Sequence, residues 1–240
     1  MNLFRRLALP DSVAVAGRTL PLEVTRRRGA RGVRLRADAV TAVVRLSLPW
    51  RGGEAEALAL LQGHQDWLAA QVAKWPRPRP FAPDAVIPFD GGELVLEWHA
   101  GHPRTPKRHG DVLRLGGPLE LLPGRTLRWL KGEALADMAA GTRELAARVE
   151  RPVTAIRLGD PRSRWGSCAS GGRIAYSWRL ILAPDFVRRN VVAHEVAHLV
   201  HPNHGPGFHA LLAELDGHAA TSRRWLARNG AGLHWVGRDG

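Results

Sequence analysis

The five residues from His194 to His198, with the sequence HEVAH, constrain the fold of this chain more than any other feature. They lie in an apolar segment from Val191 to Val200, and on a helix residues four apart are about 40° apart around the axis and one turn above each other. Both imidazoles can then reach one metal ion, with Glu195 beside them. This is the pattern with which zinc hydrolases bind their metal, and it requires the segment to be helical.

A third histidine has to complete such a site, and two candidates follow the motif. His201 lies on the same helical face, but about 10 Å along the axis from His194, whereas zinc–nitrogen bonds are about 2.0–2.1 Å long. His204 lies beyond Pro202, in a turn rich in glycine and proline that can fold back over the helix. We therefore predict Zn²⁺ ligation by His194, His198 and His204, with His201 near the ligands or the substrate.

The predicted chemistry follows from such a metal. Zinc in hydrolases usually has three protein ligands and one water, whose pKa the metal lowers. Glu195 is placed to accept the water proton and to pass it to the leaving group. The developing oxyanion needs a further hydrogen-bond donor, and the nearest candidates along the chain are Tyr176, Arg179, His201 and His209.

The net charge of +13 and the pI of about 11.5 favour an acidic or phosphate-rich partner such as a nucleotide, a nucleic acid or an anionic surface. An ordinary protein surface on which arginine replaces lysine is the alternative explanation. Cys168 is the single cysteine, so the fold does not rely on an internal disulfide. It is expected in a tight turn, with roles as a fourth metal ligand or as a nucleophile left as alternatives.

Neither a signal peptide nor a membrane span is expected. The segment from Met1 to Pro10 is too short and too interrupted for a signal peptide. No stretch approaches the roughly 20 apolar residues of a membrane span. We expect a cytoplasmic protein with no membrane association.

Hydrophobic periodicity predicts a mixed α+β chain. Alternating apolar and charged residues indicate strands, and apolar stripes at helical spacing indicate two long helices. Proline alternating with arginine after Trp75 predicts an extended connector. The predicted elements are strands within Leu20–Pro49, a helix over Glu54–Trp75, short strands within Ile87–Leu122 and a helix over Arg125–Val149.

The last third is expected to contain the catalytic unit. Val153–Leu158 and Ile174–Leu182 are predicted strands, and Pro184 with Asp185 marks the start of the motif helix. That helix should end before Pro202. In many zinc peptidases an edge strand beside the metal-binding helix binds an extended substrate by β-addition. We expect this role for Ile174–Leu182, the alternative being an ordinary core strand.

Several short motifs together resemble the YgjP-like metallopeptidase family, which is related to SprT-like zinc peptidases with a gluzincin-type core. The resemblance is strong from about Val153 to Gly230 and weaker over the amino-terminal half. The motifs are Arg164-Trp165-Gly166-Ser167-Cys168, Trp178-Arg179-Leu180-Ile181-Leu182-Ala183-Pro184, His194-Glu195-Val196-Ala197-His198, Asn203-His204, Trp225-Leu226 and Asn229-Gly230.

The resemblance implies that His194, His198 and His204 bind zinc and that Glu195 is the catalytic residue. It also implies a small, zincin-like α+β catalytic unit in which a short sheet covers the metal-binding helix. We expect a β-rich amino-terminal region over residues 1–122, followed by this catalytic domain over residues 123–240. The expected activity is that of a metallopeptidase acting on an extended peptide or protein.

Two other functions remain open from the sequence. The same zinc site could hydrolyse nucleotides, as a nucleoside triphosphate pyrophosphatase does, because the arginines between Arg26 and Arg36 suit a phosphate-rich ligand. Alternatively, the chain could be a nucleic-acid-binding protein with a structural zinc. Structural zinc sites usually have four ligands, often cysteines, so three histidines beside a glutamate favour an open, catalytic site.

Overall fold

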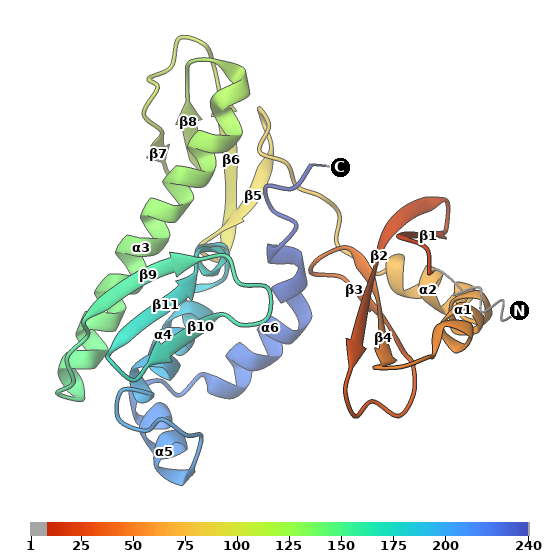
Figure 1. Cartoon of the computed structure of the whole chain (residues 1–240). Coiled ribbons are helices and arrows are strands. Elements are labelled where there is room, and N and C mark those ends of the chain that lie inside the picture. Colours follow the sequence, from red (N-terminus) through yellow and green to blue (C-terminus); the bar gives the residue numbers. More distant parts are fainter. Residues whose placement is uncertain (1–8, 240) are drawn as a thin grey trace, which may run out of the picture. The chain divides into compact units, whose positions relative to one another are not determined.

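The computed structural model describes residues 9–239 of the 240-residue chain (Figure 1). Over this range it has three β-sheets and six α-helices, which confirms the α+β class. The chain divides into two compact units, the first ending at Pro76 and the second beginning at Arg77. Most of Met1–Pro10, where no signal peptide is expected, lies outside the described residues. None of the described helices is both long and apolar enough to cross a membrane.

A four-stranded sheet with the order β1-β2-β4-β3 forms the first unit. β2 and β4 are parallel, and the other neighbours are antiparallel. Val44, Leu46 and Leu48 are completely buried, whereas Arg45 and Ser47 between them are not. This is the alternation predicted from the sequence. The strands are β1 (Ser12–Val15), β2 (Arg18–Arg27), β3 (Arg34–Asp38) and β4 (Val43–Pro49).

The helix predicted over Glu54–Trp75 is interrupted at His64. The backbone there has φ −118° and ψ 24°, outside the helical region, and Gly63 just before it has low helix propensity. Leu61 and Leu68, one on each side of the break, are both buried. The apolar stripe is therefore present, but two helices carry it. These are α1 (Glu54–Gly63) and α2 (Gln65–Val72).

The second unit contains two sheets, with the orders β5-β6-β8-β7 and β10-β11-β9. The long helix α3 runs alongside both of them (Figure 1). The elements are β5 (Val86–Phe89), β6 (Gly92–Trp98), β7 (Lys107–His109), β8 (Val112–Leu115), the 3-10 helix η1 (Leu119–Leu121), α3 (Leu122–Arg148), β9 (Ala155–Gly159), β10 (Gly166–Ala169), β11 (Arg173–Ser177), the 3-10 helix η2 (Trp178–Leu182), α4 (Asp185–Ala197), α5 (Pro206–Leu215) and α6 (Ala219–Leu233).

One hydrophobic core joins the strands before residue 122 to the helices after it. Leu94 and Leu113 belong to the same buried cluster as Leu130 and Val196. The predicted division into residues 1–122 and 123–240 therefore places its boundary inside the second unit. The two compact units separate instead at the proline- and arginine-rich segment after Trp75, where the sequence predicts a connector.

The segment Ile174–Leu182 is not one continuous strand. Residues up to Ser177 form β11, and η2 follows from Trp178. β11 is the central strand, antiparallel to β10 and parallel to β9, so it has no free edge on which a substrate could add. The expectation that this segment is the substrate-binding edge is wrong, and β10 is an edge strand of this sheet.

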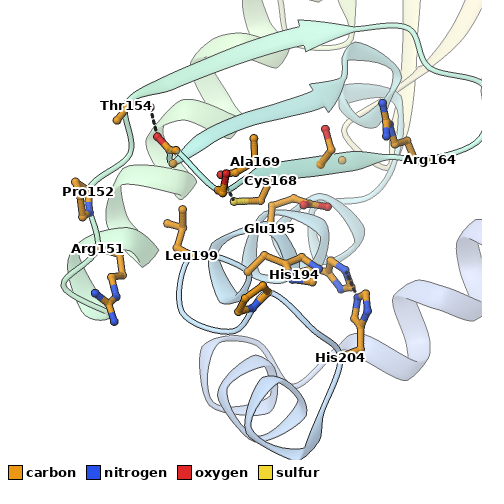
Figure 2. A pocket seen from close by; sticks show the side chains of 17 residues that line it. Arg151, Pro152, Thr154, Arg164, Cys168, Ala169, His194, Glu195, Leu199 and His204 are labelled. Atoms are coloured by element: carbon orange, nitrogen blue, oxygen red, sulfur yellow. Dashed lines mark hydrogen bonds between the residues drawn. The ribbon is translucent and has the colours of Figure 1, made fainter.

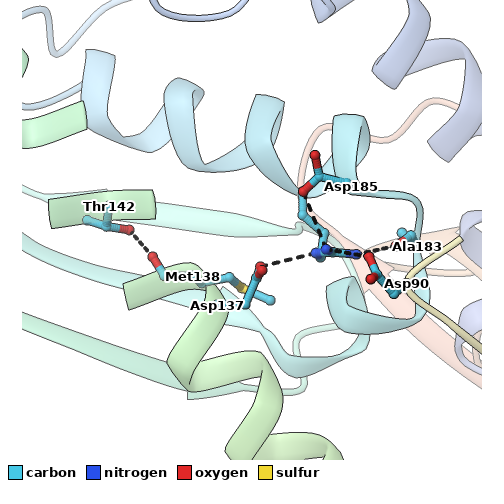
Figure 3. Close-up of polar contacts among 7 residues, drawn as sticks. Asp90, Asp137, Met138, Thr142, Ala183 and Asp185 are labelled. Atoms are coloured by element: carbon cyan, nitrogen blue, oxygen red, sulfur yellow. Dashed lines mark hydrogen bonds and ion pairs between the residues drawn. The ribbon is translucent and has the colours of Figure 1, made fainter. Parts of the chain in front are cut away.

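The helix that carries the motif is fixed by a buried arginine, Arg188, which is 3% exposed. Its guanidinium donates to Asp90 at 2.7 Å, to Asp137 at 3.1 Å and to the carbonyl of Ala183 at 2.7 Å. Asp185 lies 3.4 Å away, and Figure 3 shows these groups around the arginine. The start of α4 is thereby tied to α3 and to the turn after β5.

Candidate metal centre

Three histidines from two segments of the chain meet beside α4. Their nearest ring nitrogens all lie within 4.8 Å of one another. His194 is on the last turn of α4, His198 follows it at the helix end, and His204 reaches back from the loop before α5. α4 ends at Ala197, before Pro202 as predicted, and His198 still has helical backbone angles, which preserves the four-residue spacing. The structure thus brings together the three histidines selected from the sequence.

The separation between the ring nitrogens of His194 and His204 fits a single metal ion. The Nε2 atoms of His194 and His204 are 3.2 Å apart. Two bonds of about 2.0–2.1 Å with a tetrahedral angle place two nitrogens about 3.3 Å apart. Burial, with the neighbouring His198 and His204, lowers the pKa of His194 to about 4, so its imidazole is neutral at physiological pH. Neutral imidazole is the form that binds metals.

Each ring is held in place by neighbours outside the cluster. The Nδ1 of His198 lies 3.0 Å from the carbonyl oxygen of His201, so it donates there and leaves Nε2 free as a ligand. Phe208 of α5, 1% exposed, has its ring centroid within 4.9 Å of the centroids of His194, His198 and His204. This buried phenyl ring supports all three imidazoles, a role that sequence reasoning missed.

Glu195 lies beneath β10 and is 5% exposed. The backbone of Gly166 approaches it so closely that a β-carbon at residue 166 would be 2.5 Å from Oε1. Burial raises the pKa of Glu195 to about 7, while the charge of Arg164 acts in the opposite direction. A carboxylate with such a pKa can both accept and release a proton near neutral pH.

A cavity of about 620 Å³ opens beside these groups, lined by the three histidines, Glu195 and all of β10 (Figure 2). A second cavity of about 260 Å³ shares His194, Glu195, Arg164 and Gly166 with it and extends over residues of α5 and α6. His194 and Glu195 therefore lie where the two cavities meet. An extended ligand that passes them can occupy both.

The structure does not bring every candidate oxyanion donor to this cavity. Tyr176 is 1% exposed, and its hydroxyl pairs with Thr142 at 2.8 Å. Arg179 is held by Asp160 and by carbonyls near the carboxyl end of α6. Neither lines the cavity, so both expectations are wrong. Arg164 does line it, and in the described part of the chain this guanidinium has no ion-pair partner.

The remaining candidates have more indirect positions. The ring of His201 lies against Gly207, where a β-carbon would be 3.0 Å from Cε1. Its carbonyl, rather than its ring, orients His198. His209 packs against the edge of Phe208. Cys168 lies on β10 and lines the cavity, but it is outside the histidine cluster found among the described residues.

The motifs around the site also contact each other. A β-carbon at Gly230 of α6 would be 2.8 Å from the ring of Trp165, which precedes β10. Gly230 is therefore required for α6 to approach the strand above Glu195. These two residues lie far apart in the sequence but belong to one packing contact.

A model of the YgjP-like metallopeptidase domain matches residues 31–229. The chain belongs to the YgjP-like family. The matched range covers most of the sequence, including the three histidines, Glu195 and the strand above them, and it confirms the resemblance drawn from the short motifs. Comparisons with the curated proteins and with the solved structures find no match. In general terms, membership makes the chain a metal-dependent peptidase.

Proposed function

We propose that this protein is a zinc-dependent peptidase in which His194, His198 and His204 hold the metal and Glu195 is the general base. The observation that carries the proposal is the convergence of three imidazoles beside one buried carboxylate at the junction of two cavities. Three ligands leave a zinc coordination position open, as catalysis requires. Bound zinc would supply Lewis acidity, lowering the pKa of water and polarising the scissile carbonyl.

The protein's own groups would then perform the proton transfers. Glu195 accepts a proton from the attacking water and delivers it to the departing amine nitrogen. Its burial beneath Gly166 fixes the carboxylate and excludes bulk solvent from one side. Arg164, at the junction of the two cavities, supplies positive charge for the developing oxyanion.

An extended peptide would bind along β10. Gly166, Ser167, Cys168 and Ala169 all line the larger cavity, and β10 pairs with β11 on its other side only. Its open edge offers backbone donors and acceptors to an additional strand. Such a strand passes directly over Glu195, which brings a peptide bond to the reactive groups.

The two other functions receive less support at this site. A structural zinc site would need a fourth ligand, and the cluster among the described residues contains only the three histidines. A nucleotide hydrolase would need cations for several phosphates at the metal. In the second unit, the arginines that line the cavity beside the three histidines are Arg151 and Arg164.

The test compares the wild-type protein with Glu195→Gln. We expect both to bind about one zinc per chain, measured by mass spectrometry of the metal, and the variant to lose about a hundredfold or more of its hydrolysis of unfolded casein. Glu144→Gln, which changes an exposed glutamate of α3, is the matched control and should retain full activity.

Two outcomes would contradict the proposal. Full activity of Glu195→Gln would exclude the carboxylate as the general base. Metal-dependent release of phosphate or pyrophosphate from nucleoside triphosphates, without cleavage of casein or of a peptide library, would assign the site to nucleotide hydrolysis.

A further inference from the structure

The sheet of the first unit has one apolar face and one basic face. Paired residues of neighbouring strands project to the same side. Leu35, Leu46 and Val24 pair across the sheet and belong to the apolar side, which packs against α1 and α2. The residues next to them along each strand, Arg34 and Ser47 among them, project from the opposite side.

This opposite side carries a concentration of arginines. Between residues 26 and 36 the chain has six arginines and no acidic residue. Arg34 pairs with Ser47 of β4, Arg36 pairs with Arg45, and Arg27 pairs with Pro49. We call Arg27, Arg28, Arg31, Arg34 and Arg36, together with Trp50, the basic face.

The arginines of the basic face form no ion pairs with carboxylates in the described part of the chain, although the charge of Arg36 contributes to lowering the pKa of the nearby Asp38. Arg26 pairs with Glu54, and Arg45 pairs with Glu23 and Asp38, so these two guanidinium groups are already satisfied. Among the residues that the structure describes, no carboxylate lies within ion-pair distance of the arginines of the basic face. Their positive charges are therefore available to an external anion.

The basic face is hollowed, and an exposed aromatic ring lies beside it. Its arginines line a cavity of about 1040 Å³, with Gly29, Gly32 and Ser47. Trp50, directly after β4, is 53% exposed, and the guanidinium of Arg28 lies 5.0 Å from its ring centroid. The exposed indole is a flat ring on which an unpaired base can stack. A planar cation over an indole extends a flat surface on which a base can stack.

We propose that the basic face binds single-stranded nucleic acid, with arginines contacting phosphates and the Arg28–Trp50 pair stacking a base. A row of guanidinium groups beside an exposed indole matches a chain in which phosphates and unpaired bases alternate. A duplex hides the faces of its bases, and the carboxylates of an acidic protein have no ring face to stack on Trp50. The combination of guanidinium groups with an exposed indole therefore favours a single strand over both.

Fluorescence anisotropy of the full-length protein with labelled oligo(dT) and oligo(rU) of about 20 nucleotides tests this inference. The two oligonucleotides distinguish DNA from RNA as the source of the strand. The combined variant Arg31→Gln, Arg34→Gln and Arg36→Gln should weaken binding at least tenfold. It should also lower the slope of log K against log salt by about 2, since each phosphate contact on a single strand contributes about 0.7.

Matched controls separate the basic face from the net charge. Arg128→Gln, Lys131→Gln and Arg143→Gln together remove the same charge from exposed positions of α3 and should leave binding within about twofold. Trp50→Ala should weaken binding about tenfold, whereas Trp67→Ala, which removes a tryptophan that is 40% exposed on α2, should not.

Three results would overturn the inference. The first is binding that does not depend on salt. The second is an equal loss of oligonucleotide affinity in both triple variants. The third is tighter binding of a duplex or of anionic vesicles than of either single strand. Circular dichroism melting of every variant shows that it is folded. The measurement needs no peptidase activity, so its outcome is independent of the proposed function.

Discussion

Gly166 and Glu195 are in direct contact across the junction between β10 and α4. A β-carbon on Gly166 would lie 2.5 Å from Oε1, 2.7 Å from Cγ and 2.8 Å from Cδ of the glutamate. The strand can therefore lie over the carboxylate only because residue 166 has no side chain. This contact fixes the distance between the edge of the sheet and the proposed general base.

The first prediction concerns this contact. Gly166→Ala should reduce peptide hydrolysis at least a hundredfold, because the added methyl group displaces the Glu195 carboxylate. Zinc content should not change, because the three atoms nearest to the added methyl group all belong to Glu195 rather than to a histidine. Gly171→Ala, in the turn after β10, meets no atom within 4 Å and serves as the control. Wild-type activity in Gly166→Ala would show that the carboxylate can move without consequence.

The second prediction concerns Phe208, whose ring supports all three histidines. Phe208→Leu keeps the position apolar but removes the flat surface against which the imidazoles pack. We expect the Kd for zinc, measured by competition with a chromogenic chelator, to rise about tenfold or more, as for other groups that orient metal ligands. Glu195 is unaffected, so activity at saturating zinc should be largely recovered.

A control on the same helix separates metal binding from stability. Leu215→Val trims a buried residue, 7% exposed, at the opposite end of α5 from Phe208. It should lower the melting temperature to a similar extent without changing the zinc affinity. If both variants lose zinc equally, general loosening of α5 would explain the effect.

The metal ligands could be predicted because all three lie close together in the sequence. His194 and His198 need only the helical repeat, and His204 needs only a nearby loop that can turn back. Gly166 and Phe208 were not identified as supporting residues, because their roles arise from contacts between segments that come together only in the fold. A glycine and a phenylalanine give no separate chemical signal in a sequence.

The two errors in secondary structure have a similar origin. The alternation from Ile174 to Leu182 continues past Ser177, so the pattern contains no sign that the backbone changes to a 3-10 helix there. The apolar stripe across His64 likewise continues from one helix into the next. The order of strands within a sheet depends on long-range pairing, so the edge position of β10 required the structure.

The third prediction concerns Arg188, which anchors α4. Arg188→Met should lower the free energy of unfolding by about 2 kcal/mol, because several charge-assisted hydrogen bonds are lost while the released carboxylates regain water. Those carboxylates, Asp90, Asp137 and Asp185, are already 39–59% exposed. Arg188→Lys should recover less than half of the lost free energy of unfolding, since an ammonium group cannot reproduce the several hydrogen bonds that the planar guanidinium group donates.

Urea denaturation measures these differences, and Asp185→Asn provides the control. Asp185 is the most exposed of the three and lies 3.4 Å from the guanidinium, so its change should cost less than about 0.5 kcal/mol. A loss in Asp185→Asn as large as that in Arg188→Met would mean that a single ion pair, rather than the whole set of contacts, holds α4.

The last prediction concerns the stability of the protein in acid. Burial, and then the charge of Arg179, lower the pKa of His234 to about 4 from the 6.5 of an unfolded chain. Between these values the unfolded state binds a proton that the folded state excludes, so stability falls as the pH decreases from 6.5 towards 4. The ring also packs 5.4 Å from that of Trp165, so His234→Phe keeps an aromatic contact but cannot be protonated.

We expect wild type to lose about 2 kcal/mol more than His234→Phe between pH 7 and pH 4, measured by urea denaturation at each pH. Other groups that titrate in this range, including His194 and His198, are common to both proteins and cancel in the comparison. Parallel stability curves for the two proteins would mean that His234 gains a proton in the folded state as easily as in the unfolded chain. Protonation of groups other than His234, which lies at the end of α6 against Trp165, would then explain the loss of stability in acid.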